Sequence, residues 1–311
     1  MLEPVDTFDY QKNKTEIVYT IDARDRYKSG PGASKSKSKS KSDSEHDSES
    51  EGMTNHAEAS CWLTSVIQSL RASGAFEAEF APKKDDKNKI KKELFHLFDI
   101  SEGKNGQKRR NVTSSEIKKF KQLVIDKGLP ARMDDGFSQA TFLKFLLKEL
   151  DSPKLEYQEG SKNKKEQLLH IKIPESTKKK SIQNFIKDNK IAFTANQKAP
   201  KFLPIHVDRP RLKSSKGKKK GYITASIDPT SPLSIPVLNS GKDAKYKFVA
   251  AVICTPYWHA YTYCVEKDGW VLYDDDRVKL LTSPEKKYKD LDFSAQQDAA
   301  MHSLIFIYEA I

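Results

Sequence analysis

The feature that most constrains the fold is a change of hydrophobic periodicity near the middle of the 311-residue chain. Before about residue 150, apolar residues recur at the three- and four-residue spacing of amphipathic helices. After about residue 200, short runs of alternating apolar and polar residues are separated by turns that contain Gly, Pro or Asp, as in antiparallel strands. Helices first and strands second predict an α+β fold.

The expected elements follow from these two periodicities. The predicted helices cover residues 61–72, 87–100, a segment capped by Ser114 or Ser115, residues 138–150, and a short helix at 181–187. The predicted strands cover residues 168–173, 202–207, 222–227, 246–255, 259–266, 270–273, 278–281 and 302–309. We expect the helices to pack on a mostly antiparallel sheet that the second half of the chain forms.

Residues 1–51 differ from the rest of the chain in composition. Lysine alternates with serine from Ser34 to Ser42, and an acidic block from Asp43 to Glu51 follows. Such a segment cannot form a core, so we expect a disordered low-complexity tail or linker before one folded domain at residues 52–311. No apolar run has the length of a membrane span and the first residues form no secretory signal. We expect a cytoplasmic protein without a transmembrane segment, acting as a monomer.

The charge and the cysteines narrow the function classes. The formal net charge of +12 fits lysines solvated at the surface, an acidic partner, an anionic membrane or a nucleic acid. The lysines are spread over many segments and form no recognisable binding motif, so no nucleic acid is expected as a partner. The three cysteines form no Cys-x-x-Cys pair, which argues against a disulfide framework and a four-thiolate zinc site. We expect a reducing compartment, and neither a metal nor another cofactor.

Cys61 stands at the start of a predicted helix. Ser60 before it is a suitable N-cap, and the apolar residues after it have helical spacing: Leu63, Val66, Ile67 and Leu70. The positive end of a helix dipole favours a thiolate, which is how a nucleophilic cysteine is prepared. A buried structural cysteine in a core helix also fits this segment. A nucleophile needs a histidine from elsewhere in the fold.

His259 and Asp274 are the candidate partners of that cysteine. His259 opens a predicted strand, and Asp274 ends the next strand of the same hairpin. The turn at residues 267–269 does not bring the two into register, so a bulge or side-chain reach across the strand end is required. Each residue alone also has a structural explanation, as a strand histidine or an acidic turn. Together, a thiolate, a proton-transferring histidine and an orienting carboxylate predict a thiol hydrolase.

Several blocks of the sequence occur together in one known family. In the first block, an aromatic residue follows Cys61 and the pattern Ser-x-x-Gln-x-Leu comes next. The blocks are the Cys box at residues 52–70, a helix at 142–147, a strand at 203–209, a His box at 246–278 and a closing strand at 303–309. On these blocks the chain resembles the ubiquitin-specific protease family, papain-like thiol peptidases that remove ubiquitin, over about residues 52–310.

The resemblance implies a hand-like catalytic domain. Its helical thumb would span about 52–150, a reduced and Lys-rich fingers region about 151–200, and an antiparallel palm about 201–311. The zinc ribbon of the family's fingers is not expected, because only three cysteines are present.

The resemblance also implies residue roles. The implied triad is Cys61 as nucleophile, His259 as base and Asp274 as orienting acid, with Asp275 as an alternative acid. The family places an oxyanion-donating Asn five residues before the cysteine. Here Asn55 lies six residues before Cys61 and His56 lies five before it, so either residue is a candidate for this role.

The implied substrate is ubiquitin or a polyubiquitin chain, cut at the isopeptide bond after the C-terminal Gly-Gly through a cysteine thioester. The family's acidic tail-binding positions hold Ser138 and Thr141 here. The residues expected to hold the basic tail instead are Asp134, Asp135 and Trp258. The alternatives are a protease for another ubiquitin-like modifier, a ubiquitin-binding module without activity, and a basic nucleic-acid- or membrane-binding protein. A pathogen effector secreted into a host cytosol also fits a compact domain with a Lys-Ser tail.

Overall fold

Helices occupy the first part of the folded region and strands the second, as the change of periodicity predicts. The structure is a computed structural model. It describes Met53 and residues 59–311, apart from 135, 175–176, 178, 196–197, 210, 214–218, 223–224, 230, 256–258, 268, 276 and 283–301, and it describes only the backbone of 211–213, 219–222 and 282. The tail expected at residues 1–51 lies outside the described residues.

The predicted helices are present, with small shifts at their ends. The helices before the sheet are α1 (Cys61–Arg71), α2 (Gly74–Phe80), α3 (Lys89–Glu102), α4 (Ser114–Asp126) and α5 (Gln139–Glu149). Helix α2 was not predicted. The cap predicted at Ser114 or Ser115 is wrong, because Thr113 caps α4 in a reciprocal capping box with Glu116. No described helix combines the length and apolar character that a membrane crossing requires.

The strands form one large sheet and two small ones. They are β1 (Leu155–Glu159), β2 (Lys162–Glu166), β3 (Leu169–Lys172), β4 (Lys179–Ser181), β5 (Ile191–Phe193), β6 (Phe202–Asp208), β7 (Arg211–Lys213), β8 (Lys219–Tyr222), β9 (Ser226–Asp228), β10 (Leu233–Val237), β11 (Lys242–Cys254), β12 (Ala260–Glu266), β13 (Gly269–Asp274), β14 (Arg277–Thr282) and β15 (Ser303–Ala310), with α6 (Ile182–Asp188) after β4. The single strand predicted at 222–227 is wrong, because β8 and β9 belong to two separate small sheets.

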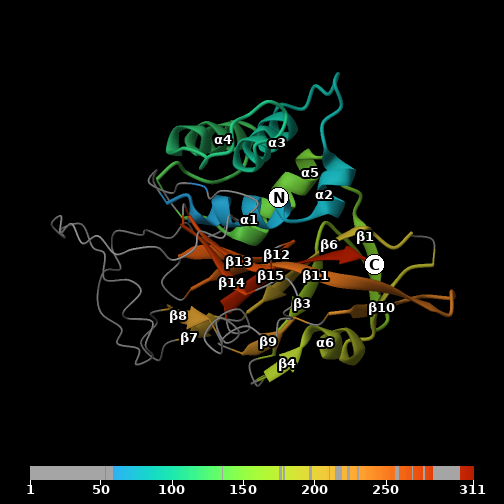
Figure 1. The fold of residues 1–311 in the computed structure, drawn as a ribbon. Helices are drawn as coiled ribbons and strands as arrows, with labels where there is room; N and C mark the ends of the chain where they lie inside the picture. Colours follow the sequence, from blue (N-terminus) through green and yellow to red (C-terminus); the bar gives the residue numbers. More distant parts are fainter. Residues whose placement is uncertain are drawn as a thin grey trace. The chain divides into compact units, whose positions relative to one another are not determined.

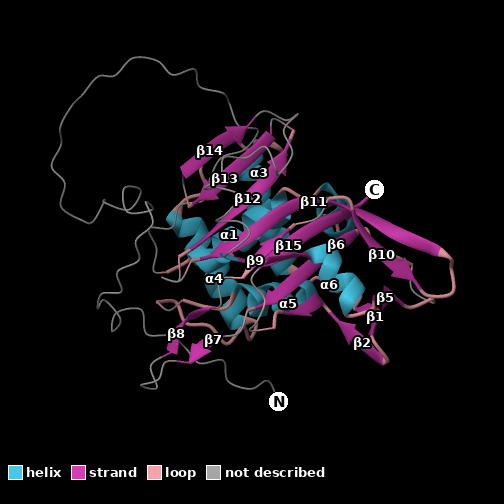
Figure 2. Cartoon of the chain, turned by 90° about the horizontal axis from the view of Figure 1, so that it is seen from below, coloured by secondary structure: helices cyan, strands magenta, loops and turns pink. Residues whose placement is uncertain are grey.

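The large sheet is mostly antiparallel, as predicted. Its main path runs β14-β13-β12-β11-β10-β5-β1-β2, and β15, β6 and β3 join it through β11. The pairs β3–β6 and β10–β5 are parallel. Figure 2 shows β12, β13 and β14 side by side at one end of the sheet.

The two faces of the sheet carry two separate apolar cores. Along β11, Ala250 and Val252 pack with the helices, whereas Ala251 and Ile253 pack with α6 and the strands near it. This alternation is the two-residue period of a strand buried on both faces. Every residue of α1 is buried, and α1 packs against β11 and β12. Figure 1 shows α3 and α4 on the side of α1 that faces away from the sheet.

Candidate active site

Cys61 is the first residue of α1 and is 8% exposed. The helix begins here because the amides of Leu63 and Thr64 both donate to the carbonyl of Ser60, at 2.9 and 3.0 Å. Ser60 occupies the predicted N-cap position, but its side chain makes no capping hydrogen bond. The sulfur of Cys61 therefore lies at the end of α1 where the helix dipole favours an anion.

His259 and Asp274 meet across the open end of the β12–β13 hairpin. In this hairpin Glu266 pairs with Gly269 and Thr262 with Tyr273, with no register shift. If the same register continues towards the open end of the hairpin, Asp274 faces Tyr261, which follows His259 by two residues in the sequence. The His259 side chain reaches this diagonal neighbour, and its Nε2 lies 2.5 Å from Asp274 Oδ1. Of the two explanations that the sequence left open, side-chain reach is correct and a bulge is not required.

The imidazole of His259 connects Asp274 to Cys61. Asp274 engages Nε2 and the ring also hydrogen-bonds the Cys61 side chain, which leaves Nδ1 as the nitrogen available to the thiol. Burial lowers the pKa of His259, but the hydrogen bonds to Asp274 and Cys61 outweigh it and raise the pKa to about 10. The ring is therefore protonated near neutral pH. In this state it pairs with a thiolate and can donate a proton.

The turn after Asp274 is tied to two other segments through one backbone carbonyl. Asp275 has a φ of 59°, in the left-handed region that non-glycine residues adopt infrequently. Its carbonyl accepts from the backbone amide of Met53 at 2.9 Å and from Nε2 of Gln68 at 3.3 Å. Gln68 lies on α1. The nucleophile helix and the segment before it are therefore both fixed to the turn that carries the acid.

A buried ionic cluster fixes the other end of α1 to the same hairpin. Arg71 Nη2 lies 2.8 Å from Glu266 Oε1, and the Tyr273 hydroxyl donates to the same oxygen at 2.6 Å. The guanidinium also lies 4.7 Å from the centroid of the Tyr273 ring. Glu102 of α3 approaches Arg71 Nη1 at 3.5 Å. Since Tyr273 immediately precedes Asp274, this cluster sets the position of α1 relative to the acid.

Several residues that the sequence singled out are not part of this geometry. Asn55, His56, Asp135 and Trp258 lie outside the described residues. Asp134 is described, and it is exposed in the loop before α5. The structure thus brings Cys61, His259 and Asp274 together, with Asp275 beside them, and leaves the expected oxyanion donor as a prediction.

Sequence reasoning missed one buried charge near Cys61. Lys121 of α4 is fully buried, and its Nζ donates to the carbonyls of Met133 and Ala59. A signal for its burial exists in the sequence, because Lys121 lies on the same helical stripe as Ile117 and Val124.

Metal binding is the alternative function of the acidic residues beside His259. Among the described residues, one ligand-type atom from each of His259, Asp274 and Asp275 lies within 4.8 Å of the others. The His259 ring, however, is already engaged by Asp274 on one side and by Cys61 on the other. The donor set therefore fits proton transfer better than metal binding.

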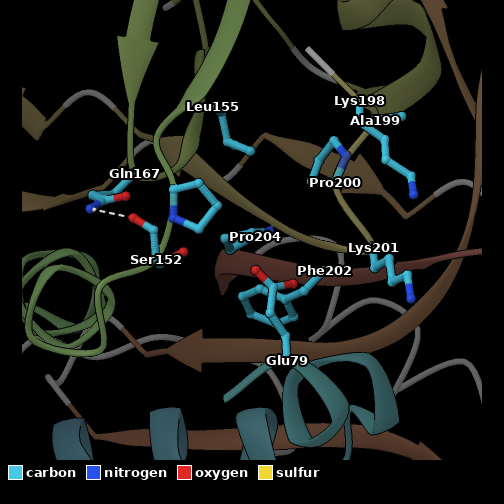
Figure 3. A pocket seen from close by; sticks show the side chains of 11 residues that line it. Glu79, Ser152, Leu155, Gln167, Lys198, Ala199, Pro200, Lys201, Phe202 and Pro204 are labelled. Atoms are coloured by element: carbon cyan, nitrogen blue, oxygen red, sulfur yellow. Dashed lines mark hydrogen bonds between the residues drawn. The ribbon is translucent and has the colours of Figure 1, made fainter.

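A cavity of about 190 Å³ lies elsewhere, between the ends of α2 and α5 and the starts of β1 and β6. Figure 3 shows Glu79 and Lys201 on one side of it and Gln167, whose amide donates to the carbonyl of Ser152 at 3.3 Å, on another. Burial raises the pKa of Glu79, and Lys201 opposes this effect. None of the triad candidates lines this cavity, and its lining offers no nucleophile with an adjacent base.

Comparisons with known proteins agree with the fold. The family model described as ubiquitin carboxyl-terminal hydrolase matches residues 51–308. No curated protein sequence matches the chain at a significant level. Among solved structures, one chain of the SAGA DUB module of Ubp8, Sgf11, Sus1 and Sgf73, bound to monoubiquitin, is similar in fold. The TM-score is 0.58 and the identity 11%, over 84% of this chain and 69% of that one.

Proposed function

Because the chain belongs to the ubiquitin carboxyl-terminal hydrolase family, we propose that it is a thiol-dependent deubiquitinase. The observation that carries the proposal is the linked set of Cys61, His259 and Asp274 inside the span that the family model matches. Its substrate is ubiquitin or a polyubiquitin chain, and the bond cut is the amide after the C-terminal Gly-Gly. In this proposal residues 52–150 form a thumb, 151–200 a reduced fingers region and 201–311 a palm.

The proposed reaction follows from the contacts of His259. The Cys61 thiolate attacks the carbonyl carbon of the terminal glycine, and the protonated His259 ring gives its proton to the leaving amine. The amine departs and a thioester remains on Cys61. His259, now neutral, removes a proton from water, which attacks the thioester and releases the carboxylate and the thiolate. Asp274 holds the ring through Nε2 and stabilises its charged form in both steps.

The oxyanion donor and the tail-binding residues complete the proposal. Asn55 or His56 donates to the oxygen of the tetrahedral intermediate, where one donor contributes roughly 3 to 4 kcal/mol. Asp134, Asp135 and Trp258 bind the basic tail of the modifier. The Ser and Thr at the family's acidic positions motivate a second candidate substrate, a ubiquitin-like modifier with a different tail. The comparisons give no support to the secreted-effector hypothesis.

The test is hydrolysis of ubiquitin that carries a fluorogenic C-terminal amide. The full chain should release the fluorophore, and Cys61→Ala should reduce the rate to background because it removes the nucleophile. Parallel substrates made from ubiquitin-like modifiers identify the preferred one. Binding of ubiquitin without turnover by the wild-type chain would instead select the inactive binding module.

A further inference from the structure

Lys121 is a buried cation with contacts to the residues on both sides of the proposed nucleophile. It lies on α4 and is fully buried. Its Nζ donates to the carbonyl of Met133 at 2.5 Å and approaches the carbonyl of Ala59 at 3.5 Å. The same ammonium lies 5.5 Å from the centroid of the Trp62 ring. Ala59 and Trp62 both lie within two positions of Cys61.

The two carbonyls belong to different loops. Ala59 has a φ of 51° in the segment that leads into Cys61, a conformation that a non-glycine residue keeps only where its surroundings hold it. Met133 precedes Asp134 in the loop before α5, which we propose binds the modifier's tail. A single ammonium therefore joins the loop before the nucleophile to the loop before α5.

The aromatic ring beneath Lys121 joins the same two segments. Trp62 follows Cys61, and its ring contacts Phe137 at 5.4 Å and Phe142 at 5.2 Å between centroids. Phe137 lies in the loop before α5, and Phe142 lies on α5. The Trp62 ring and the Lys121 ammonium thus both connect the residues next to Cys61 with the loop before α5.

Stability alone does not require a lysine at this position. Burying an ammonium carries a large desolvation cost, so a buried charged contact is weak evidence for a stabilising role. We propose that Lys121 is a positioning residue. It holds the loop before Cys61 and the loop before α5 in the relative positions that the reaction requires. This inference rests on the proposed function, because it assigns one residue's part in that reaction.

The test compares Lys121→Met, which keeps the length and removes the donor, with Lys118→Met, which changes an exposed lysine on the same helix. Steady-state hydrolysis of the fluorogenic ubiquitin amide gives kcat and KM on the full chain. Titration with a ubiquitin probe that carries a C-terminal electrophile gives the fraction of active molecules. Thermal melting reports folding. Lys121→Arg, which keeps the charge and the donors, serves as the rescue.

Positioning predicts that Lys121→Met lowers kcat per titrated site about tenfold or more and raises KM. The melting temperature also falls, because the carbonyls of Met133 and Ala59 lose this donor, but the kinetic loss remains in the molecules that are folded and titrated. Lys118→Met should stay within about twofold of wild type, and Lys121→Arg should recover most of the loss. A purely structural role would instead lower the titrated fraction and leave kcat per site and KM unchanged, which would overturn the inference.

The remaining outcomes are also decisive. If Lys121→Met does not fold, Lys121→Gln replaces it, and unchanged kinetics in that folded variant would likewise overturn the inference. If the wild-type chain has no titratable site, the proposed function fails and the inference fails with it. An active wild type with an unaffected Lys121→Met overturns the inference alone.

Discussion

His259 determines the protonation chemistry of the candidate site, because it touches both the carboxylate and the thiol. Its pKa is raised to about 10 although burial opposes the charged form, so the interactions with Asp274 and Cys61 dominate. The charge on Asp274 therefore does more than orient the ring. It extends the pH range over which His259 stays protonated beside the sulfur.

Replacing Asp274 with Asn keeps the shape and removes the charge. In Asp274→Asn the pKa of His259 should fall from about 10 towards its ordinary value of roughly 6.5. The alkaline limb of kcat/KM should move to lower pH, and kcat near neutral pH should fall on the order of 10²-fold. A pH–rate profile of ubiquitin amide hydrolysis measures both effects. An unchanged profile, together with a large loss in Asp275→Asn, would transfer the acid role to Asp275.

The same raised pKa gives a stability signature with a defined sign. The folded pKa of His259 exceeds the unfolded one, so its stabilising contribution is complete below about pH 6.5. This contribution is lost as the pH rises through about 10. Melting curves of wild type between neutral and alkaline pH should show this loss, and those of Asp274→Asn should show less of it.

At the scale of elements, α1 connects the nucleophile to the hairpin that holds the base and the acid. Near its start Cys61 meets His259, further along Gln68 binds the carbonyl of Asp275, and at its end Arg71 binds Glu266. The helix is buried along its whole length. Any tilt of α1 against β12 and β13 therefore changes the distance between the sulfur and the imidazole.

The Arg71 cluster should contribute strongly to stability. Arg71→Met removes the guanidinium that lies against the buried Glu266 carboxylate, and the free energy of unfolding should fall by about 3–5 kcal/mol. Urea unfolding measures this change. Glu266→Gln in the same variant should restore part of the loss, because it removes the negative charge that Arg71 faces in the wild type.

The matched control breaks an exposed ion pair on another part of the helical layer. Arg110 Nη2 lies 2.7 Å from Glu116 Oε1 at the start of α4, and the Arg110 side chain is 43% exposed. Arg110→Met should cost less than about 1 kcal/mol, because solvent screens such pairs. Equal losses in Arg71→Met and Arg110→Met would contradict the role given to the buried cluster.

At the scale of the molecule, the division into a helical layer and a sheet was predictable, and so was the approach of three distant residues. Helical spacing placed Cys61 at a helix start, and the hairpin turn placed His259 and Asp274 at one end of two neighbouring strands. These placements depend on periodicity and turns, which are local properties of a sequence. The approach of Cys61 to the other two residues was expected from the chemistry of a thiol nucleophile and from the family resemblance.

The elements that the sequence did not reveal depend on contacts between distant segments. Strand β2 has the sequence Lys-Asn-Lys-Lys-Glu, which has low strand propensity, yet it pairs with β1 and its Lys165 forms an ion pair with the facing Glu156. Helix α2 has only seven residues, too few for a clear periodicity. The sequence did not single out Lys121, which is buried because backbone carbonyls from two loops accept hydrogen bonds from its ammonium.

The central claim is that Cys61 attacks the C-terminal glycine of ubiquitin. The most direct measurement is reaction of the full chain with a ubiquitin probe that carries a C-terminal electrophile, followed by mass spectrometry of the adduct. We predict one ubiquitin per chain, attached to the peptide that contains Cys61. Cys61→Ala should show no adduct, whereas Cys254→Ala and Cys264→Ala, which change the two other buried thiols, should still be labelled. An unlabelled wild type, or an adduct on Cys61→Ala, would contradict the claim.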